Sequence, residues 1–353
     1  MTGEPYRRNH YDVTNRILVA DPATVRDEVV RVVSGVHPDA EVGPLERAFD
    51  VFAHLFAGEH EGYVGCDTWY HDAQHSLDCT LVMARLAAGH DMAARAGEEL
   101  GARRLVLGLI AALFHDAGYI RHRGDPESHG AEFTLYHVRR SGSFLAEFLD
   151  TVGYGDRASM SEQLVHFTGY EVALDRIEVH EPLDRRLGFL LGTADLLAQM
   201  SDRCYLEKCR DCLYPEFEIC GLAGDPREGG PDPVYGSPED LLRQTPLFID
   251  QVWADRLDGY FESVYRHAET FFGGDNPYLD AIRSHLARLD LAQRTEGIYR
   301  GLRRRVECIN AGPLRVILGL RDDDEAAREQ ARPPAPGNLR RCYGVGEAVP
   351  PPV

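Results

Sequence analysis

The chain has 353 residues, 44% of them hydrophobic, and a formal net charge of −19 at pH 7. This apolar content is enough for a sizeable core, which excludes disorder as the main state. The acidic balance excludes a nucleic-acid polymer as a general partner, because phosphate backbones are bound by clustered Lys and Arg. A small phosphate ester remains compatible with this charge, since bound divalent cations can supply positive charge locally.

No apolar run reaches the roughly 18–20 residues that a membrane-spanning helix needs. The first residues, MTGEPYRRNHYDVTNR, are polar and charged, so we expect neither membrane insertion nor a secretory signal peptide. The eight cysteines are scattered along the chain. Together these features predict a cytoplasmic protein whose thiols are reduced.

Apolar residues recur at spacings of three and four from residue 44 to about residue 310, and no alternating strand pattern competes with them. This periodicity predicts an all-α fold. The predicted organisation is a partly helical N-terminal extension (1–43, with about the first 20 residues loosely held), a helical bundle (44–220), a Gly- and Pro-rich loop (221–237), C-terminal helices packed on the bundle (238–312) and a disordered Pro- and Gly-rich tail (313–353).

Caps and apolar faces place several helices within the bundle. The predicted helices are one capped by Asp67 or Thr68 that runs through residue 90, a buried one over 104–114, one opened by Asp125-Pro126 that runs to 149, a short one over 161–166 and a long one from 183 to about 213. The C-terminal helices are rich in aromatic residues at helical spacing. We expect these aromatics to pack on the bundle, with a pocket wall or a homodimer face as the alternative.

Imidazole and carboxylate side chains stand at the ends or in the interior of these buried helices. His71 and His75 are four residues apart and therefore share a helix face. The doublet His115-Asp116 ends the buried helix, and Asp195 lies inside the apolar stretch LGFLLGTADLLAQM. Burying such a carboxylate without a partner costs several kcal/mol, so Asp195 needs a cation or strong donors.

Two further histidines have a comparable position, because His129 and His166 lie at the ends of predicted helices. A set of imidazoles and carboxylates suits Zn, Fe, Mn or mixed sites, and a carboxylate can bridge two cations. An alternative for Asp195 is an ion pair with an arginine such as Arg203. The remaining candidates, His60, His90, His122, His137, His180 and His267, lack such a context and are assigned to surface or structural positions.

The order His75, His115-Asp116, Asp195 resembles the signature of the HD superfamily of metal-dependent phosphohydrolases, named for its His-Asp doublet. The segment YHDAQHSLD resembles the YHNxxH segment of class I cyclic nucleotide phosphodiesterases. LFHDAGYIRHRGDPESHGAEF resembles the HD-x-G and H-x-x-GAE run of dinuclear HD proteins, and QLVHFTGYE resembles the segment that supplies their next ligand. The resemblance covers roughly residues 65 to 215 and implies an HD-type helical bundle with additional C-terminal helices.

The resemblance implies a role for each matching residue. His75, His115, Asp116 and Asp195 would hold a first divalent cation, and Asp116 would bridge to a second one bound by His129 and His166. His71 matches the histidine that protonates the leaving oxygen in the phosphodiesterases. The implied reaction is hydrolysis of a small phosphate ester or diester by a metal-activated water, with Fe, Mn, Zn or Mg as the cations.

Other residues near the motifs are candidates for supporting roles. Asp72 could orient His71 or a neighbouring water, and Gln199 lies one turn beyond Asp195. The candidate substrate contacts are Tyr119, Arg121, Gln199 and Arg203, with a surface or salt-bridge role as the alternative for Tyr119 and the two arginines.

The sequence also departs from each subfamily, which leaves the substrate open. Asp72 replaces the phosphodiesterase Asn, and Tyr119 stands where those enzymes have a second His and where other HD proteins have Lys. Two other functions therefore stay open: an HD-type diiron oxygenase and a non-catalytic metal-binding regulatory module. The cysteines of CYLEKCRDCLYPEFEIC contain one C-x-x-C and no second one, which favours a packed core over a zinc site.

Overall fold

The computed structural model describes residues 7–225, 232–295, 297 and 301–320. The helices are α1 (Pro22–Val36), α2 (Gly43–Ala57), α3 (Ala73–Ala93), α4 (Gly101–Phe114), α5 (His137–Thr151), α6 (Ala158–Leu164), α7 (Pro182–Ser201), α8 (Tyr205–Lys208), α9 (Tyr214–Cys220), α10 (Pro238–Val252), α11 (His267–Phe272), α12 (Pro277–Thr295) and α14 (Ala311–Ile317). Short 3₁₀ and π turns connect several of them. Apart from isolated bridges, no strand occurs in these residues, so the predicted all-α fold is confirmed.

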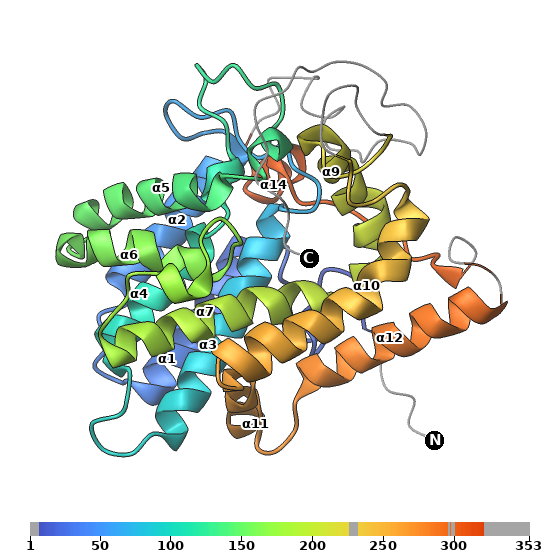
Figure 1. The fold of residues 1–353 in the computed structure, drawn as a ribbon. Coiled ribbons are helices and arrows are strands. Elements are labelled where there is room, and N and C mark those ends of the chain that lie inside the picture. Colours follow the sequence, from blue (N-terminus) through green and yellow to red (C-terminus); the bar gives the residue numbers. More distant parts are fainter. Residues whose placement is uncertain (1–6, 226–231, 296, 298–300, 321–353) are drawn as a thin grey trace.

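Helix α3 is the centre of the bundle. It packs against α1, α4, α7 and α11, and its residues from Ala73 to Asp91 are all buried. In Figure 1, α3 runs behind α7, and α10 and α12 run alongside α7. The approach of α11 is close at Gly89, where an added Cβ would lie 2.0 Å from the carbonyl oxygen of His267. A glycine at this point therefore allows the C-terminal helices to pack directly on the bundle.

The predicted start of this helix at Asp67 or Thr68 is wrong, because α3 begins at Ala73 with Asp72 as its N-cap. The carboxylate of Glu216 in α9 accepts hydrogen bonds from the backbone N–H groups of Trp69 (2.6 Å) and Tyr70 (2.7 Å). These long-range bonds hold the segment before Asp72 in a non-helical conformation. Asp72 then accepts the N–H of His75, which satisfies a donor that the first helical turn leaves free.

The helix predicted from residue 125 to 149 forms only in its second half, as α5. The preceding residues make turns and a 3₁₀ turn (Gly130–Phe133) with a capping box, in which Glu132 accepts from the backbone of His129 while the His129 ring accepts from Ala131. Gly130 also packs tightly here, since an added Cβ would lie 2.4 Å from the carbonyl oxygen of Tyr119. The short predicted helix corresponds to α6 and the 3₁₀ turn that follows it (Val165–Phe167).

The long helix predicted from residue 183 to about 213 is interrupted after Ser201. Asp202 accepts the N–H of Cys204 (2.6 Å) and pairs with the Nζ atom of Lys208 (2.8 Å), which turns the chain. The chain continues through α8, a π turn (Cys209–Leu213) and α9. This turn brings α9, and with it Glu216, back over the start of α3.

The C-terminal helices pack on the bundle, and the last of them, α14, extends beyond residue 312. α10, α11 and α12 contribute residues to the hydrophobic core, and α14 packs against α2. The predicted tail from residue 313 therefore begins within a helix, and its residues after 320 lie outside the described ones. In the predicted loop, residues 221–225 and 232–237 contain turns and one bridge, between Ala223 and Tyr235, and the rest lies outside the described residues.

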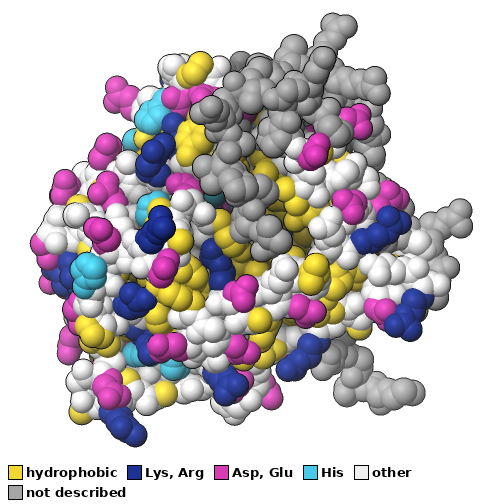
Figure 2. All heavy atoms as spheres, viewed as in Figure 1, with side chains coloured by type: hydrophobic (Ala, Val, Ile, Leu, Met, Phe, Trp, Pro, Cys, Tyr) yellow, Lys and Arg dark blue, Asp and Glu magenta, His cyan; other side chains and the backbone are white. Residues whose placement is uncertain are grey.

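One face of the molecule carries mixed charge. Figure 2 shows acidic and basic side chains interspersed over the same face, with hydrophobic side chains gathered in a hollow near its middle. Among the described residues, no helix combines the length and apolar character that a bilayer crossing requires.

The N-terminal segment from residue 7 is bound to the bundle rather than loosely held. The buried carboxylate of Asp12 pairs with the Nη2 atom of Arg85 in α3 at 2.6 Å, and Arg85 also donates to the Tyr278 hydroxyl at 2.8 Å. Both charges of the pair are buried. The network therefore ties the N-terminal segment, α3 and α12 together.

We predict that Asp12→Ala lowers the free energy of unfolding by about 3–5 kcal/mol, because it leaves the Arg85 guanidinium buried without its carboxylate. Urea unfolding of the purified protein measures this loss. The control is Asp27→Ala, which removes a carboxylate that is 71% exposed and should change stability by less than about 0.5 kcal/mol. Equal stability of the two variants would contradict the prediction.

A second prediction concerns pH. His285 in α12 is buried, and burial together with the charge of Arg304 lowers its pKa to about 4. Its pKa in the unfolded chain is higher, so the unfolded state binds more protons between pH 4 and 6.5, and stability falls as the pH decreases through this window. His285→Gln should reduce the loss of stability between pH 7 and pH 5 by about 1–2 kcal/mol, measured by urea unfolding at both values. His180→Gln, at an exposed position, should leave that loss unchanged.

Candidate metal centre

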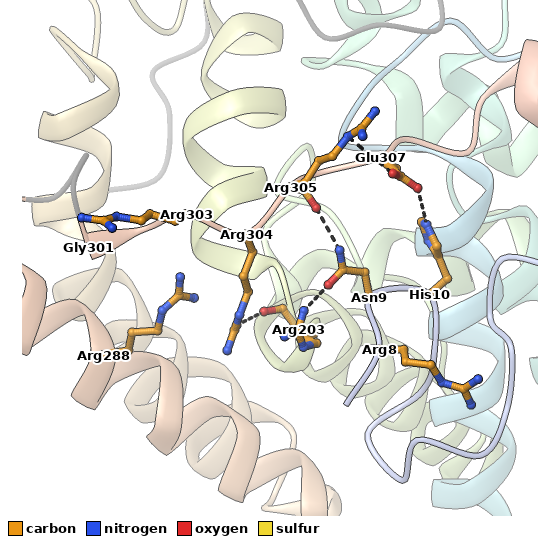
Figure 3. Close-up of a pocket in the computed structure, with 10 residues that line it drawn as sticks. All are labelled: Arg8, Asn9, His10, Arg203, Arg288, Gly301, Arg303, Arg304, Arg305 and Glu307. Carbon is orange, nitrogen blue, oxygen red and sulfur yellow. Dashed lines mark hydrogen bonds and ion pairs between the residues drawn. The ribbon is translucent and has the colours of Figure 1, made fainter. Parts of the chain in front are cut away.

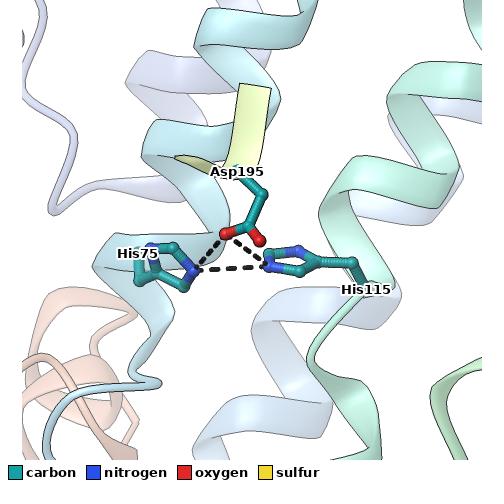
Figure 4. Close-up of side chains that lie close together, drawn as sticks. All are labelled: His75, His115 and Asp195. Atoms are coloured by element: carbon teal, nitrogen blue, oxygen red, sulfur yellow. Dashed lines mark hydrogen bonds and ion pairs between the residues drawn. The ribbon is translucent and has the colours of Figure 1, made fainter. Parts of the chain in front are cut away.

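Three buried side chains from three helices converge at one point: His75 near the start of α3, His115 at the end of α4 and Asp195 in α7. The Nε2 atoms of the two imidazoles are 3.3 Å apart. The Oδ1 atom of Asp195 lies 3.1 Å from Nε2 of His75 and 3.6 Å from Nε2 of His115. Figure 4 shows the two rings directed toward the same carboxylate. Such convergence of imidazole and carboxylate donors is compatible with metal binding.

Asp116 adds a fourth donor to this cluster. Its Oδ2 atom lies 3.4 Å from Nε2 of His75 and 3.3 Å from Nε2 of His115. The same oxygen is buried and has no hydrogen-bond partner among the described residues. A buried carboxylate oxygen without a donor is costly, so the donor set fits a cation at this point.

The charges of the cluster stabilise one another. Burial alone would lower the pKa of His115, but the carboxylates of Asp116 and Asp195 outweigh burial and raise this pKa to about 9. Conversely, burial alone would raise the pKa of Asp195, but its bonds to His115 and His75 hold this pKa well below its usual range. The two carboxylates therefore remain negative and favour a positive partner, which can be a proton on an imidazole or a divalent cation in exchange for that proton.

A second histidine group adjoins the cluster. The Nδ1 atom of His71 lies 2.6 Å from a carboxylate oxygen of Glu216, which is completely buried. Burial lowers the pKa of His71, but the charge of Glu216 and its hydrogen bond outweigh burial and raise it. Tyr119 stacks on the His71 ring at a centroid distance of 4.3 Å and on the His137 ring at 4.2 Å. His71 is therefore fixed in orientation from two sides.

Sequence reasoning missed two of these residues. Glu216 lies 145 residues from its partner His71, and its position in α9 carries no local signal of that contact. His137 was assigned to the surface or structural group, yet its Nε2 atom lies 3.6 Å from Oδ1 of Asp116. Burial lowers the pKa of His137 to about 4, so this ring is neutral at pH 7 and keeps a nitrogen lone pair that can bind a cation.

The two histidines predicted for a second cation lie apart from these contacts. His129 uses Nδ1 to cap its own turn, and its ring packs on Trp69 at a centroid distance of 4.6 Å. Its Nε2 atom and the Nδ1 atom of His166 are buried and lack hydrogen-bond partners within the described chain. No described contact joins either ring to the His75–His115–Asp195 cluster, so a second cation stays a prediction.

Of the residues predicted to support the site, Gln199 lies near the cluster, whereas Asp72, Arg121 and Arg203 are engaged in other contacts. Gln199 lies beside the cluster, since it accepts from the Tyr70 hydroxyl at 3.2 Å and lines the same small space as His75. Asp72 has both carboxylate oxygens engaged with backbone N–H groups, those of His75 and Ile309, which gives it a capping position. Arg121 pairs with Asp67 at 2.9 Å. Arg203 donates to Asn9 and lines a different cavity, described below.

The cysteines predicted to be core residues are mostly buried. Cys204, Cys209 and Cys212 are buried, Cys220 is half-buried, and the Sγ atom of Cys212 lies 3.5 Å from that of Cys308. Within the described part of the chain, the cluster of three or more possible metal ligands is the one formed by His75, His115 and Asp195, and it includes no cysteine. The core assignment thus agrees with the burial of these side chains.

Comparison with known proteins gives no further guide to this site. No protein-family model matches the chain, and no curated protein or solved structure is similar enough to count as a match.

We predict that metal co-purifies with the protein and is lost in His115→Ala and Asp195→Asn. Both changes remove a donor from the buried cluster, and Asp195→Asn preserves the shape of the side chain. Elemental analysis of protein purified without added metal gives the stoichiometry, and His180→Ala, at an exposed position, is the control. Unchanged metal content in both folded variants would contradict the assignment. Two equivalents in the parent protein, with one lost in His166→Ala, would support a second cation at His129 and His166.

Proposed function

We propose that the protein is a metal-dependent hydrolase of a small phosphate ester or diester, of the HD type. The observation that carries this proposal is the buried convergence of His75, His115, Asp116 and Asp195 beside a histidine held by a buried carboxylate. The order of these residues in the chain resembles the HD signature, which supports the same proposal. A bound divalent cation supplies a water of lowered pKa and positive charge for the phosphate oxygens.

The proposed role of His71 follows from its hydrogen bonds. Because Nδ1 donates to Glu216, the other ring nitrogen, Nε2, is available on the side of Tyr119, whose hydroxyl lies 3.5 Å away. The negative charge of Glu216 favours the ring with both nitrogens protonated. His71 can therefore hold a proton at Nε2 and donate it to the leaving oxygen as a general acid.

Glu216 and Tyr119 act as positioning residues in this scheme. Glu216 binds the backbone of Trp69 and Tyr70 with one oxygen and His71 with the other. It therefore fixes both the position of the loop before α3 and the orientation of the His71 ring. Tyr119 stacks on His71 with an interplanar angle of 15°, which restrains rotation of the imidazole. The proton donor is thus held in place before a substrate binds, which lowers the entropy cost of reaching the reactive geometry.

The test compares two phosphodiesters with different leaving groups. We predict that His71→Ala keeps its metal. It should lower kcat by about 10²- to 10⁴-fold for diphenyl phosphate, because the basic phenolate leaving group needs a proton donor. The loss should be smaller for bis-p-nitrophenyl phosphate, whose leaving group is less basic. Glu216→Gln should give an intermediate loss with the same dependence on leaving group.

The matched control for this experiment is His180→Ala, which changes an exposed histidine and should leave both rates unaltered. Equal losses of His71→Ala on the two esters would refute the general-acid role. Absence of hydrolysis by the metal-loaded parent protein on either ester would count against the hydrolase itself.

A further inference from the structure

A cavity lies beside the turn that follows α7. Its volume is about 710 Å³, within the range of small-molecule sites. Its walls come from the N-terminal segment, the residue after the α7 turn, α12 and the segment that begins at Gly301 (Figure 3). Among the described residues, six arginines line it: Arg8, Arg203, Arg288, Arg303, Arg304 and Arg305.

This concentration of positive charge is opposite to the character of the chain, which has 38 Lys and Arg against 57 Asp and Glu. Among the described residues that line the cavity, Glu307 is the one carboxylate, and it pairs with His10 at 3.0 Å and with Arg305 at 3.5 Å. The guanidiniums also repel one another. Burial lowers the pKa of Arg304, and the charges of Arg288 and Arg203 lower it further. A multiply charged anion in the cavity would relieve this repulsion.

Several of the arginines are fixed by contacts behind the cavity wall. Arg288 is bound by Glu207, which is completely buried. Arg203 donates to the side chain of Asn9, and the Asn9 amide donates in turn to the carbonyl oxygen of Arg305 at 2.9 Å. Arg304 donates to the carbonyl oxygen of Arg203. The wall is thus built before any ligand binds, which reduces the ordering cost of binding.

We infer that this cavity is a binding site for a linear oligophosphate, recognised through its phosphate groups. The planar fork of a guanidinium matches two phosphate oxygens, and several adjacent arginines suit a chain of phosphates better than a single one. Among the described residues, those that line the cavity include no Phe, Tyr or Trp on which a base could stack. The phosphate chain, whether free or part of a nucleotide, is the element that these arginines recognise.

The cavity is separate from the metal centre, because none of the cluster residues lines it. The two are nevertheless neighbours in the fold. His10 lies at the cavity and its Nδ1 atom contacts Gln74, the residue before His75, at 2.8 Å. Arg203 follows the same helix, α7, that carries Asp195. The inference does not depend on the proposed hydrolase activity.

Isothermal titration with inorganic triphosphate tests the site, using the full chain with its metal-centre variant Asp195→Asn in parallel. The double variant Arg303→Gln/Arg305→Gln removes two charges at outer positions of the cavity and should raise the Kd for triphosphate by about tenfold or more. The matched control, Arg283→Gln/Arg294→Gln, removes two exposed arginines of α12 that do not line the cavity and should change the Kd by less than twofold. Asp195→Asn should bind triphosphate as the parent does, which separates this site from chelation at the metal centre.

The outcomes are distinct. ATP binding with a Kd within a few-fold of that for triphosphate supports recognition of the phosphate chain alone. ATP binding without detectable triphosphate binding overturns the inference, as does equal weakening in the cavity and control variants. Loss of binding in Asp195→Asn assigns the phosphates to the metal centre and also overturns it.

Discussion

The arrangement of the bundle depends on two carboxylates, Asp116 and Asp195, that are buried at the junction of three helices. Each is a charge in an apolar region, and its burial is tolerated because the imidazoles of His75 and His115 lie beside it, with His137 of α5 also near Asp116. Such a cluster requires all its members in place, since removing one partner leaves an uncompensated buried charge. The same buried charges therefore constrain both the packing of α3 against α4 and α7 and the geometry of the candidate metal centre.

The outer wall of the site is built by contacts between distant segments rather than by the central helices. Glu216 of α9 holds the loop before α3 and the His71 ring, while Asp72 at the start of α3 binds the backbone of Ile309. Contacts from α9 and from the segment around Ile309 thus position residues of the site that the bundle helices carry. This explains why the chain after α9 packs back on the bundle instead of forming a separate unit.

The sequence pattern predicted the inner cluster because a carboxylate in an apolar helix is a local signal. Asp195 within a run of Leu and Ala, and the doublet at the end of α4, both indicate buried charge. Glu216 and His137 carry no such signal, since their importance comes only from partners brought close by folding. Helix boundaries failed for the same reason: Glu216 prevents a helix at residues 69–70, and Asp202 interrupts the helix that periodicity extends to residue 213.

The interruption at Asp202 also connects the two charged regions of the molecule. Helix α7, which carries Asp195, ends at this turn, and the next residue, Arg203, lines the arginine-rich cavity. Asp202 pairs with Lys208 and lies near Gln74, whose side chain contacts His10 on the cavity side. A phosphate chain bound by the arginines would therefore rest against the same turn and the same start of α3 that hold Asp195 and His75. The fold places a positive cavity and the acidic cluster of candidate metal ligands at either end of one short, hydrogen-bonded connection, within a chain that is acidic overall.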